Sequence, residues 1–452
     1  MNTPICDFVN KYAKGDFSRL HMPGHKGVAF LGFEEFDITE IVGADSLYHA
    51  QGIIRESEDN ATRIFGTKRT LYSTEGSSQC IKAGLKLLID EFRVKHGAKE
   101  RPVVVASRNA HVAFIYAAAL LDFDIKWIWP EDNSDNICSC VVSQESLKTT
   151  LMELEKEPAC VYITSPDYLG EVADISALSD ICHEFGTFLF TDNAHGSYMK
   201  FLSKDSGYAH PMDLGSDMCC DSAHKTLPAL TGAAYLHIGK SMSDDLTDNA
   251  KSAMALMGST SPSYLTMISL DKCNEYLADS FKSDLKKFIG KFDRVKNRLK
   301  ALGWSLLDTD PLRLTIDAAS AGYTGIELSA QFRENRCECE YADEKYLVLM
   351  LTPSNSDVDL ERIADCCENC SIKQPLVIGT KKRIVPKVVC SVREAMMMPS
   401  KKCTPLEAVG KVCADPLVSC PPAIPLVVSG ELITNELAGE LARYDVKELR
   451  CL

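Results

Sequence analysis

Short apolar runs that end in polar residues recur through the middle of the chain. They lie at 102–106, 159–165, 186–192 and 214–220, and segments with helical periodicity separate them throughout 70–240. Continuous apolar runs of this length are typical of strands that are buried on both faces of a parallel sheet. The alternation predicts an α/β fold with a doubly wound, mainly parallel sheet.

Two of these runs lead into side chains that suit one cofactor. Asp192 ends the run 186–192, and Lys225 follows the run 214–220 closely. Ligands of open α/β sheets bind outside the carboxyl ends of the strands. Pyridoxal phosphate needs an amine that condenses with its aldehyde and a carboxylate that keeps its ring nitrogen protonated. We therefore predict that Lys225 and Asp192 bind this cofactor, with His195 near its phenolic oxygen; a surface lysine and an ordinary strand-end aspartate are the alternative.

A glycine and two serines form a turn that suits the cofactor's phosphate. Gly76, Ser77 and Ser78 precede a helix that we expect from Cys80 to about Arg93. Free backbone N–H groups and the positive end of a helix dipole attract phosphate at such a position. Similar turns also cap ordinary helices. With Lys225 downstream, we expect this turn to hold the phosphate.

Two further segments carry histidines in positions of interest. His21, His25 and Lys26 share a loop with proline and glycines, which indicates either a site or a surface turn. His111 stands where an apolar run passes into a helical segment. Its ring could stack on the face of the cofactor, or it could cap the helix.

Composition restricts the classes of function. The chain has 452 residues, 45% hydrophobic and 25% charged, which is ordinary for a soluble protein with two or three structural units. A net charge of −14 argues against a nucleic-acid partner. There is no apolar run of membrane-spanning length, no secretory leader pattern and no G-x-G-x-x-G fingerprint. We expect a cytoplasmic protein that does not bind membranes and is not a nicotinamide enzyme.

The 19 cysteines are scattered through the predicted core. We read them as reduced thiols. Close pairs exist, but none has a second pair at zinc spacing with nearby histidines. We expect no metal site. The pairs and their neighbours are Cys138 with Cys140, Cys337 with Cys339, and Cys366 and Cys367 with Cys370.

Changes in pattern along the chain predict four parts. Residues 1–50 form an amino-terminal arm with an active-site loop, and residues 51–265 form the cofactor-binding large domain. Residues 266–375 form a linker helix and a small α+β domain, and 376–452 form a carboxy-terminal domain. One long helix is expected over about 264–302.

Taken in order, several segments resemble the signatures of the Orn/Lys/Arg decarboxylase family. The resemblance covers nearly the whole chain, and its collinearity is more specific than any single motif. The segments are HMPGHKG at 21–27, DITEIVGADSL at 37–47, NAH at 109–111, TSPDYLG at 164–170, DNAHG at 192–196, SAHKTLPALTGAAYLH at 222–237, STSPSYL at 259–265, and CPPAIP followed by SGE at 420–431.

The resemblance implies a fold type I, aspartate aminotransferase-like large domain with smaller α+β carboxy-terminal domains. It implies pyridoxal 5′-phosphate as the cofactor and decarboxylation of lysine, arginine or ornithine. Lys225, Asp192 and His224 would be catalytic, with His224 contacting the substrate carboxylate or moving a proton. The further cofactor-binding residues would be Ala194 and His195 beside the ring, His111 stacked over it, and Gly76, Ser77, Ser78, Ser222 and Ser261 at the phosphate.

The resemblance also implies a homodimer or larger homo-oligomer with its active sites at the subunit interface, so that Thr260 and Ser261 reach the partner's phosphate. His25 and Glu431 are candidates for binding the substrate, and Glu75, Asp45 and Asp167 are other acids that could bind a basic side chain. The chain begins almost at the HMPGHKG segment. It is therefore expected to be a short form without the amino-terminal wing domain.

Departures from the family pattern leave other chemistry open. The phosphate turn reads Thr-Glu-Gly-Ser-Ser-Gln, Asn193 stands where glutamate is common, and Val112-Ala113 follow His111 where lysine and serine are frequent. Lys225 and Asp192 are shared by all fold type I enzymes. An aminotransferase or another lyase, a decarboxylase of a non-basic amino acid, and a regulator without turnover are the alternatives.

Overall fold

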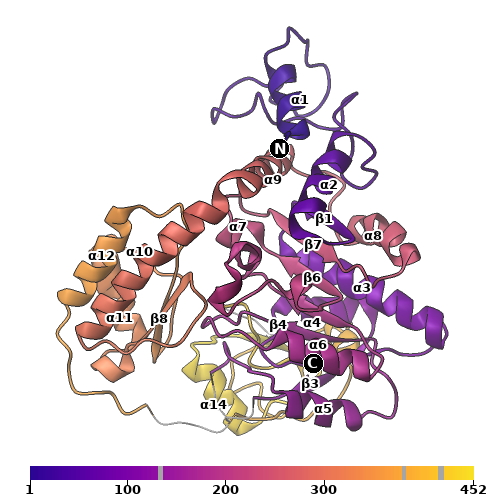
Figure 1. The fold of residues 1–452 in the computed structure, drawn as a ribbon. Helices are drawn as coiled ribbons and strands as arrows, with labels where there is room; N and C mark the ends of the chain where they lie inside the picture. The colour runs from indigo at the N-terminus through magenta and orange to yellow at the C-terminus, as the bar shows by residue number, and fades with distance from the viewer. Residues whose placement is uncertain (131–135, 379–382, 416–421) are drawn as a thin grey trace. The chain divides into compact units, whose positions relative to one another are not determined.

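The structure, a computed structural model, describes residues 1–130, 136–378, 383–415 and 422–452 (Figure 1). The chain forms two compact units, and neither is continuous in sequence. The first unit comprises Met1–Glu100, Ala159–Val161 and Ile175–Ser283. The second comprises Arg101–Pro158, Tyr162–Asp174 and Asp284–Leu452.

The main sheet has seven strands in the order β1-β7-β6-β5-β4-β2-β3. β2 pairs with β3 and β5 with β6 in parallel, whereas β7 runs antiparallel to β1 and to β6. The predicted mainly parallel α/β sheet is confirmed, with β7 as an antiparallel strand that the apolar runs did not single out. The strands are β1 Arg69–Ser73, β2 Val103–Ser107, β3 Asp124–Ile128, β4 Cys160–Thr164, β5 Leu189–Asp192, β6 Met218–Asp221 and β7 Ala234–Ile238.

Two glycines with positive φ set one end each of two helices in the first unit. α2 ends where Gly66, at φ 71°, turns into the left-handed region. α3 begins at Ser77, earlier than predicted, because Gly76 at φ 72° turns the chain directly into the helix. The helices are α1 Pro4–Ala13, α2 Ile53–Phe65, α3 Ser77–His96, α6 Ile175–Glu184, α7 Ala223–Thr226, α8 Asp244–Leu256 and α9 Tyr264–Asp279, with 3₁₀ turns η1 Ser197–Phe201, η2 Lys204–Ser206 and η3 Pro211–Asp213.

The single long helix predicted over 264–302 is wrong. Two helices, α9 and α10 (Phe281–Ala301), meet at Ser280, whose N–H closes α9 on the carbonyl of Tyr276. Phe281 is buried, and its ring packs edge-on against Phe201, 5.1 Å between ring centroids. The break at Ser280 is therefore accompanied by the burial of this ring in the core.

Two small antiparallel sheets form the remainder of the second unit, which agrees with the expected α+β carboxy-terminal part. Their strand orders are β8-β10-β9 and β11-β13-β12. The strands are β8 Arg313–Asp317, β9 Tyr341–Ala342, β10 Tyr346–Met350, β11 Lys401–Cys403, β12 Cys413–Asp415 and β13 Leu449–Cys451. The helices are α4 Val112–Leu121, α5 Gln144–Met152, most of α10, η4 Ala319–Ala321, α11 Gly325–Glu334, α12 Asp357–Glu368, α13 Val392–Met397 and α14 Asn435–Arg443.

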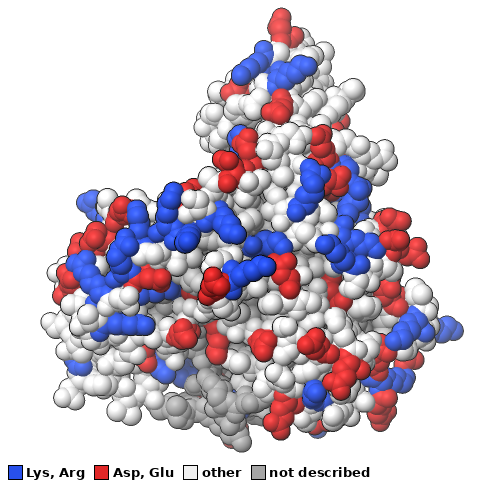
Figure 2. All heavy atoms as spheres, viewed as in Figure 1, with Lys and Arg blue, Asp and Glu red and all other residues white. Residues whose placement is uncertain are grey.

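Ion pairs connect α10 to α12. Arg298 contacts Glu361 at 2.8 Å and Glu368 at 2.7 Å, and Lys291 contacts Asp357 at 2.6 Å. Figure 2 shows Lys and Arg side chains gathered over α10 with acidic side chains beside them. The basic side chains of α10 are therefore partly neutralised by neighbours. Among the described residues, no helix is both long and apolar enough to cross a membrane.

Candidate active site

Lys225 is presented at the carboxyl end of β6. The strand ends at Asp221, and Ser222 leads into the single turn α7 that carries the lysine. The Nζ atom of Lys225 lies 2.8 Å from Nε2 of His195, which follows the parallel neighbour β5. The structure therefore brings together two of the predicted site residues from adjacent strand ends.

Asp192 is the last residue of β5 and is buried. Its Oδ1 atom accepts hydrogen bonds from the Cys220 thiol at 3.4 Å and from the N–H of Ala194 at 3.2 Å. A buried carboxylate is stable only with hydrogen-bonding or charged partners. The protonated ring nitrogen of pyridoxal phosphate is a partner of this kind.

The predicted phosphate turn is hydrogen-bonded to the segments on either side of Lys225. Ser222 donates from its Oγ to Oγ of Ser77 at 2.9 Å, and the N–H of Gly76 binds the carbonyl of Gly232 at 2.7 Å. Ser77 and Ser78 open α3, so their N–H groups stand at the positive end of a long helix. An amine, a buried carboxylate and an anion cradle within the first unit fit pyridoxal phosphate.

His224 is held in one tautomer. Its Nδ1 atom lies 2.9 Å from the carbonyl oxygen of Ala233 and must donate, since a carbonyl only accepts. Burial, with the nearby charge of Lys225, lowers the pKa of His224. The ring is therefore neutral at neutral pH, and its Nε2 atom can accept a proton.

Two other predicted residues have local partners, and a third is exposed. His111 belongs to the second unit, and its Nδ1 atom accepts the N–H of Ala113 at 3.1 Å, so it caps α4. His25 lies in the arm with its Nε2 atom 3.2 Å from the Asp37 carboxylate. Ser261 is exposed, as part of the loop before α9. Stacking by His111, packing by Ala194 and the roles of His25 and Ser261 stay predictions.

Similarity to known proteins identifies the enzyme family. The family model described as "Orn/Lys/Arg decarboxylase, major domain" matches residues 3–307. The chain belongs to the Orn/Lys/Arg decarboxylase family. It is an amino acid decarboxylase, a carboxy-lyase that depends on pyridoxal phosphate.

Individual relatives agree with this assignment. An arginine decarboxylase of Bacillus subtilis (strain 168) is 25% identical over 463 residues, 96% of this chain and 92% of its own. Lysine decarboxylase A from Pseudomonas aeruginosa has a similar structure, with a TM-score of 0.80, 16% identity, and 99% and 80% of the two chains covered. The serine palmitoyltransferase of Sphingomonas wittichii, at a TM-score of 0.55 and 14% identity, covers 81% of this chain and 83% of its own. The last two likenesses show that the decarboxylase has the predicted fold type I architecture.

The decarboxylase uses one of the proposed substrate acids to begin a helix. Both carboxylate oxygens of Asp45 accept backbone N–H groups, among them Gln51 at 3.1 Å and Gly52 at 2.8 Å. These hydrogen bonds lower the pKa of Asp45 against the opposing effect of burial. Asp45 therefore organises the start of α2, and its oxygens are occupied.

Asp167 lies in a turn of the second unit. Its Oδ1 atom accepts the N–H groups of Gly170 at 2.9 Å and Glu171 at 3.0 Å. Burial raises the pKa of Asp167 to about 7. Near neutral pH this carboxyl is therefore partly protonated, which weakens it as a partner for a cation.

Glu431 is ion-paired with an arginine that the sequence analysis overlooked. Nη2 of Arg108 lies 3.4 Å from Oε2 of Glu431, and both side chains are buried. The N–H of Val428 binds the same oxygen at 2.7 Å. The guanidinium of Arg108 also lies over the rings of Trp127 and Trp129, at 5.0 and 5.2 Å. The sequence signal for this site was a charged residue just after an apolar run, since a buried arginine requires an acidic or aromatic partner.

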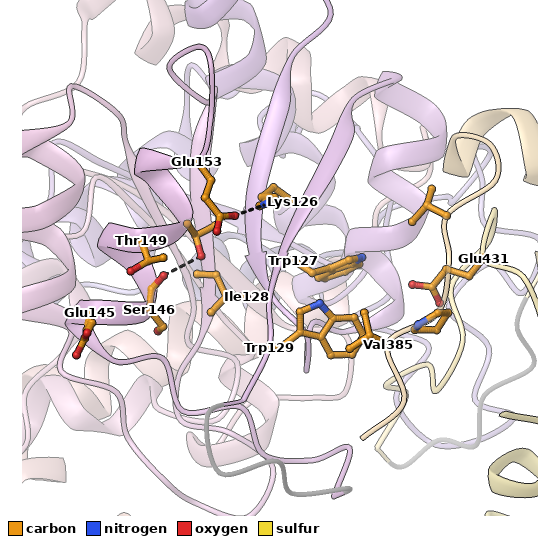
Figure 3. Close-up of a pocket in the computed structure, with 13 residues that line it drawn as sticks. Lys126, Trp127, Ile128, Trp129, Glu145, Ser146, Thr149, Glu153, Val385 and Glu431 are labelled. Carbon is orange, nitrogen blue, oxygen red and sulfur yellow. Dashed lines mark hydrogen bonds and ion pairs between the residues drawn. The ribbon is translucent and has the colours of Figure 1, made fainter. Parts of the chain in front are cut away.

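Glu431 also lines a hollow of the second unit. The cavity measures about 630 Å³, and Figure 3 shows the two indoles of Trp127 and Trp129 facing the segment that carries Glu431. Lys126 and Glu153 form an ion pair of 2.7 Å in its wall. The hollow thus combines aromatic and acidic side chains of the kind that attract cations. Arg108 and Lys126 already contact several of them.

Proposed function

We propose that this decarboxylase removes the α-carboxylate of a basic amino acid, either lysine, arginine or ornithine, and releases the amine and CO2. The observation that carries the proposal is the contact between Lys225 and His195 beside buried Asp192 in a chain of this family. The printed names of relatives, arginine and lysine decarboxylases, support a basic substrate. A non-basic amino acid is the second candidate, since an L-aspartate decarboxylase of Thermococcus kodakarensis is 28% identical over 164 residues.

Each residue has a distinct task in this proposal. Lys225 would hold the cofactor through Nζ, Asp192 would pair with its ring nitrogen, and Ser77 and Ser222 would bind its phosphate. When bound, the cofactor accepts the electron pair left by the departing CO2. The residues around it orient the substrate so that the bond to the α-carboxylate is the one that breaks.

When CO2 leaves, one proton must be added to Cα in its place. His224 is neutral at neutral pH because burial lowers its pKa, so it is suited to accept a proton rather than to give one. Lys225 lies beside His195 and has an exchangeable proton on Nζ. We assign proton delivery at Cα to Lys225, with His224 placed to contact the substrate.

The distal cation of the substrate requires a carboxylate. Asp45 is occupied by backbone N–H groups, and Asp167 is partly protonated. Glu431 and Glu75 remain. Burial raises the pKa of Glu431 too, against the lowering effect of Arg108 and of the Val428 N–H. We assign the role to Glu431 because it lines an aromatic, acidic hollow. Glu75 is the competing candidate, since it is exposed next to the phosphate turn and accepts the N–H of Ser259.

We propose that the working form is a homodimer in the cytoplasm and that the amine enters polyamine synthesis. The amino-terminal arm supports self-association because it exposes large apolar side chains, which favours burial against another protein surface. Leu20 and Phe30 are each 92% exposed, and Val42 is fully exposed. A second chain would cover these side chains.

The test is CO2 release by the protein loaded with pyridoxal phosphate, against all proteinogenic amino acids and ornithine. Release from one basic amino acid and its loss in Lys225→Ala are the expected results. Release from a non-basic amino acid alone would contradict the substrate class. Amino-group transfer to a keto acid without CO2 would contradict the reaction.

A further inference from the structure

A fully buried carboxylate, Asp221, ends β6 one residue before Ser222. Oδ2 of Asp221 is 3.0 Å from Nε2 of His210 and 3.2 Å from Nε2 of His237. All three side chains have no exposed surface. His210 begins the turn η3 and His237 lies on β7, so two separate elements converge on Asp221, which itself ends β6.

The second oxygen of Asp221 reaches the other strand of the site. Oδ1 accepts the side-chain N–H of Asn193 at 2.7 Å, and the N–H of Asn193 binds the carbonyl of Cys220 at 3.0 Å. Asn193 directly follows Asp192, whose own Oδ1 accepts the Cys220 thiol. Both the side chain and the backbone of Asn193 are thus attached to the end of β6.

The network favours an ionised carboxylate at position 221. Burial acts to raise the pKa of Asp221, but His210 and His237 together lower it well below its usual range. Burial also lowers the pKa of His237. A second carboxylate at position 193 would lie against this charge, whereas the amide of asparagine donates to it. This explains in physical terms why position 193 holds an amide.

We propose that Asp221 and Asn193 act as a matched pair of positioning residues. Asp221, held by the two histidines, holds Asn193 in place. Asn193 in turn fixes the Asp192 carboxylate and His195 relative to Lys225. The proposal rests on the roles that we have assigned to Asp192 and Lys225. It predicts that cofactor binding requires one carboxylate and one amide at positions 193 and 221, whichever position holds which group.

Exchanging the pair tests this dependence. Asn193→Asp places two carboxylates in contact, and the double variant Asn193→Asp/Asp221→Asn restores one carboxylate and one amide. We expect Asn193→Asp to weaken pyridoxal phosphate binding at least tenfold and to change the visible circular dichroism of the bound cofactor. The double variant should return to within about threefold of the unaltered protein, with its dichroism restored. Equal defects in the single and double variants would overturn the proposal.

A matched control lies at the other end of the same strand. Asp217, just before β6, is also buried and lies 2.9 Å from His183. Asp217→Asn should lower the thermal midpoint while leaving cofactor affinity and dichroism unchanged. If Asn193→Asp fails to fold, Asn193→Ala replaces it in the test, because it removes the donor without adding charge. We expect Asn193→Ala to weaken pyridoxal phosphate binding, but by less than the tenfold expected for Asn193→Asp. Cofactor changes of equal size in Asp217→Asn would overturn the proposal, since they would indicate general instability.

Zinc binding by this network and failure of the substrate proposal can each be distinguished from failure of the positioning role. His210, Cys219 and Asp221 have ligand atoms within 4.8 Å of one another. Stoichiometric zinc in the purified protein, lost in His210→Gln, would overturn the assignment of this network to positioning. Cofactor binding and dichroism need no turnover, so a failure of the substrate proposal would appear only as missing CO2 release in the unaltered protein and would leave the exchange experiment decisive.

Discussion

Nε2 of His195 lies 2.8 Å from Nζ of Lys225. The two side chains extend from the carboxyl ends of the parallel strands β5 and β6, so the pairing of the strands sets this separation. A hydrogen bond between an imidazole and an amine orients the amine and influences its protonation. The contact therefore restricts the orientation of the Lys225 amine.

His195→Phe tests this contact while preserving an aromatic ring. We expect kcat to fall about 100-fold, the lower end of the usual range for losing a group that assists proton transfer. The cofactor should remain bound, because Lys225 and the phosphate turn are intact. The measurement is steady-state CO2 release together with the absorbance of the bound cofactor. An unchanged kcat would show that His195 has no part in the reaction.

Ser222→Ala tests the phosphate cradle. Loss of a hydrogen bond to a charged group costs roughly 1.5–3 kcal/mol, so the Kd for pyridoxal phosphate should rise about 10- to 100-fold. Ser216→Ala is the control, because Ser216 is buried at the opposite end of β6 and hydrogen-bonds Thr191 at 2.9 Å. Titration of the apo-protein measures both constants. Equal effects of the two substitutions would contradict a phosphate role for Ser222.

Glu431→Gln should raise KM for the basic substrate at least tenfold. It should also lower Tm, because the buried guanidinium of Arg108 loses its anionic partner. The double variant Arg108→Gln/Glu431→Gln separates the effects, since Tm should recover while KM stays high. A larger rise in KM in Glu75→Gln than in Glu431→Gln would instead assign the distal group to Glu75.

Asp167 predicts a definite dependence of stability on pH. Burial raises its pKa to about 7, so the folded state binds a proton more tightly than the unfolded state. Stability should therefore fall as pH rises from about 4 to about 7, by up to about 4 kcal/mol, and then level off. Asp167→Asn keeps the acceptor for Gly170 and should remove this dependence. Denaturant unfolding at several pH values measures it, and identical pH profiles for the two proteins would contradict the assignment.

Much of the site could be predicted because strand ends share an edge. Asp192 and Lys225 stand at the ends of apolar runs, and parallel neighbours place such residues together. The histidines around Asp221 could not be predicted in this way. His210 comes from a 3₁₀ turn and His237 from the antiparallel strand β7, and no periodicity connects them.

Local backbone geometry accounts for other differences. Asp45 resembles a substrate-binding acid in the sequence, but its φ of 67° places it under the start of α2, where it accepts backbone N–H groups. The break at Ser280 depends on where Phe281 is buried. Both features follow from tertiary packing, which outweighs the local pattern.

The central claim is that Lys225 is the lysine that binds the cofactor, and peptide mapping after borohydride reduction tests it most directly. Sodium borohydride reduces the carbon–nitrogen bond between pyridoxal phosphate and its lysine to a stable amine, which mass spectrometry can then locate. Lys251, largely buried and paired with Glu58 at 2.5 Å, is an internal comparison. We predict modification at Lys225 and none at Lys251. Modification at another lysine, or CO2 release that persists in Lys225→Ala, would contradict the account.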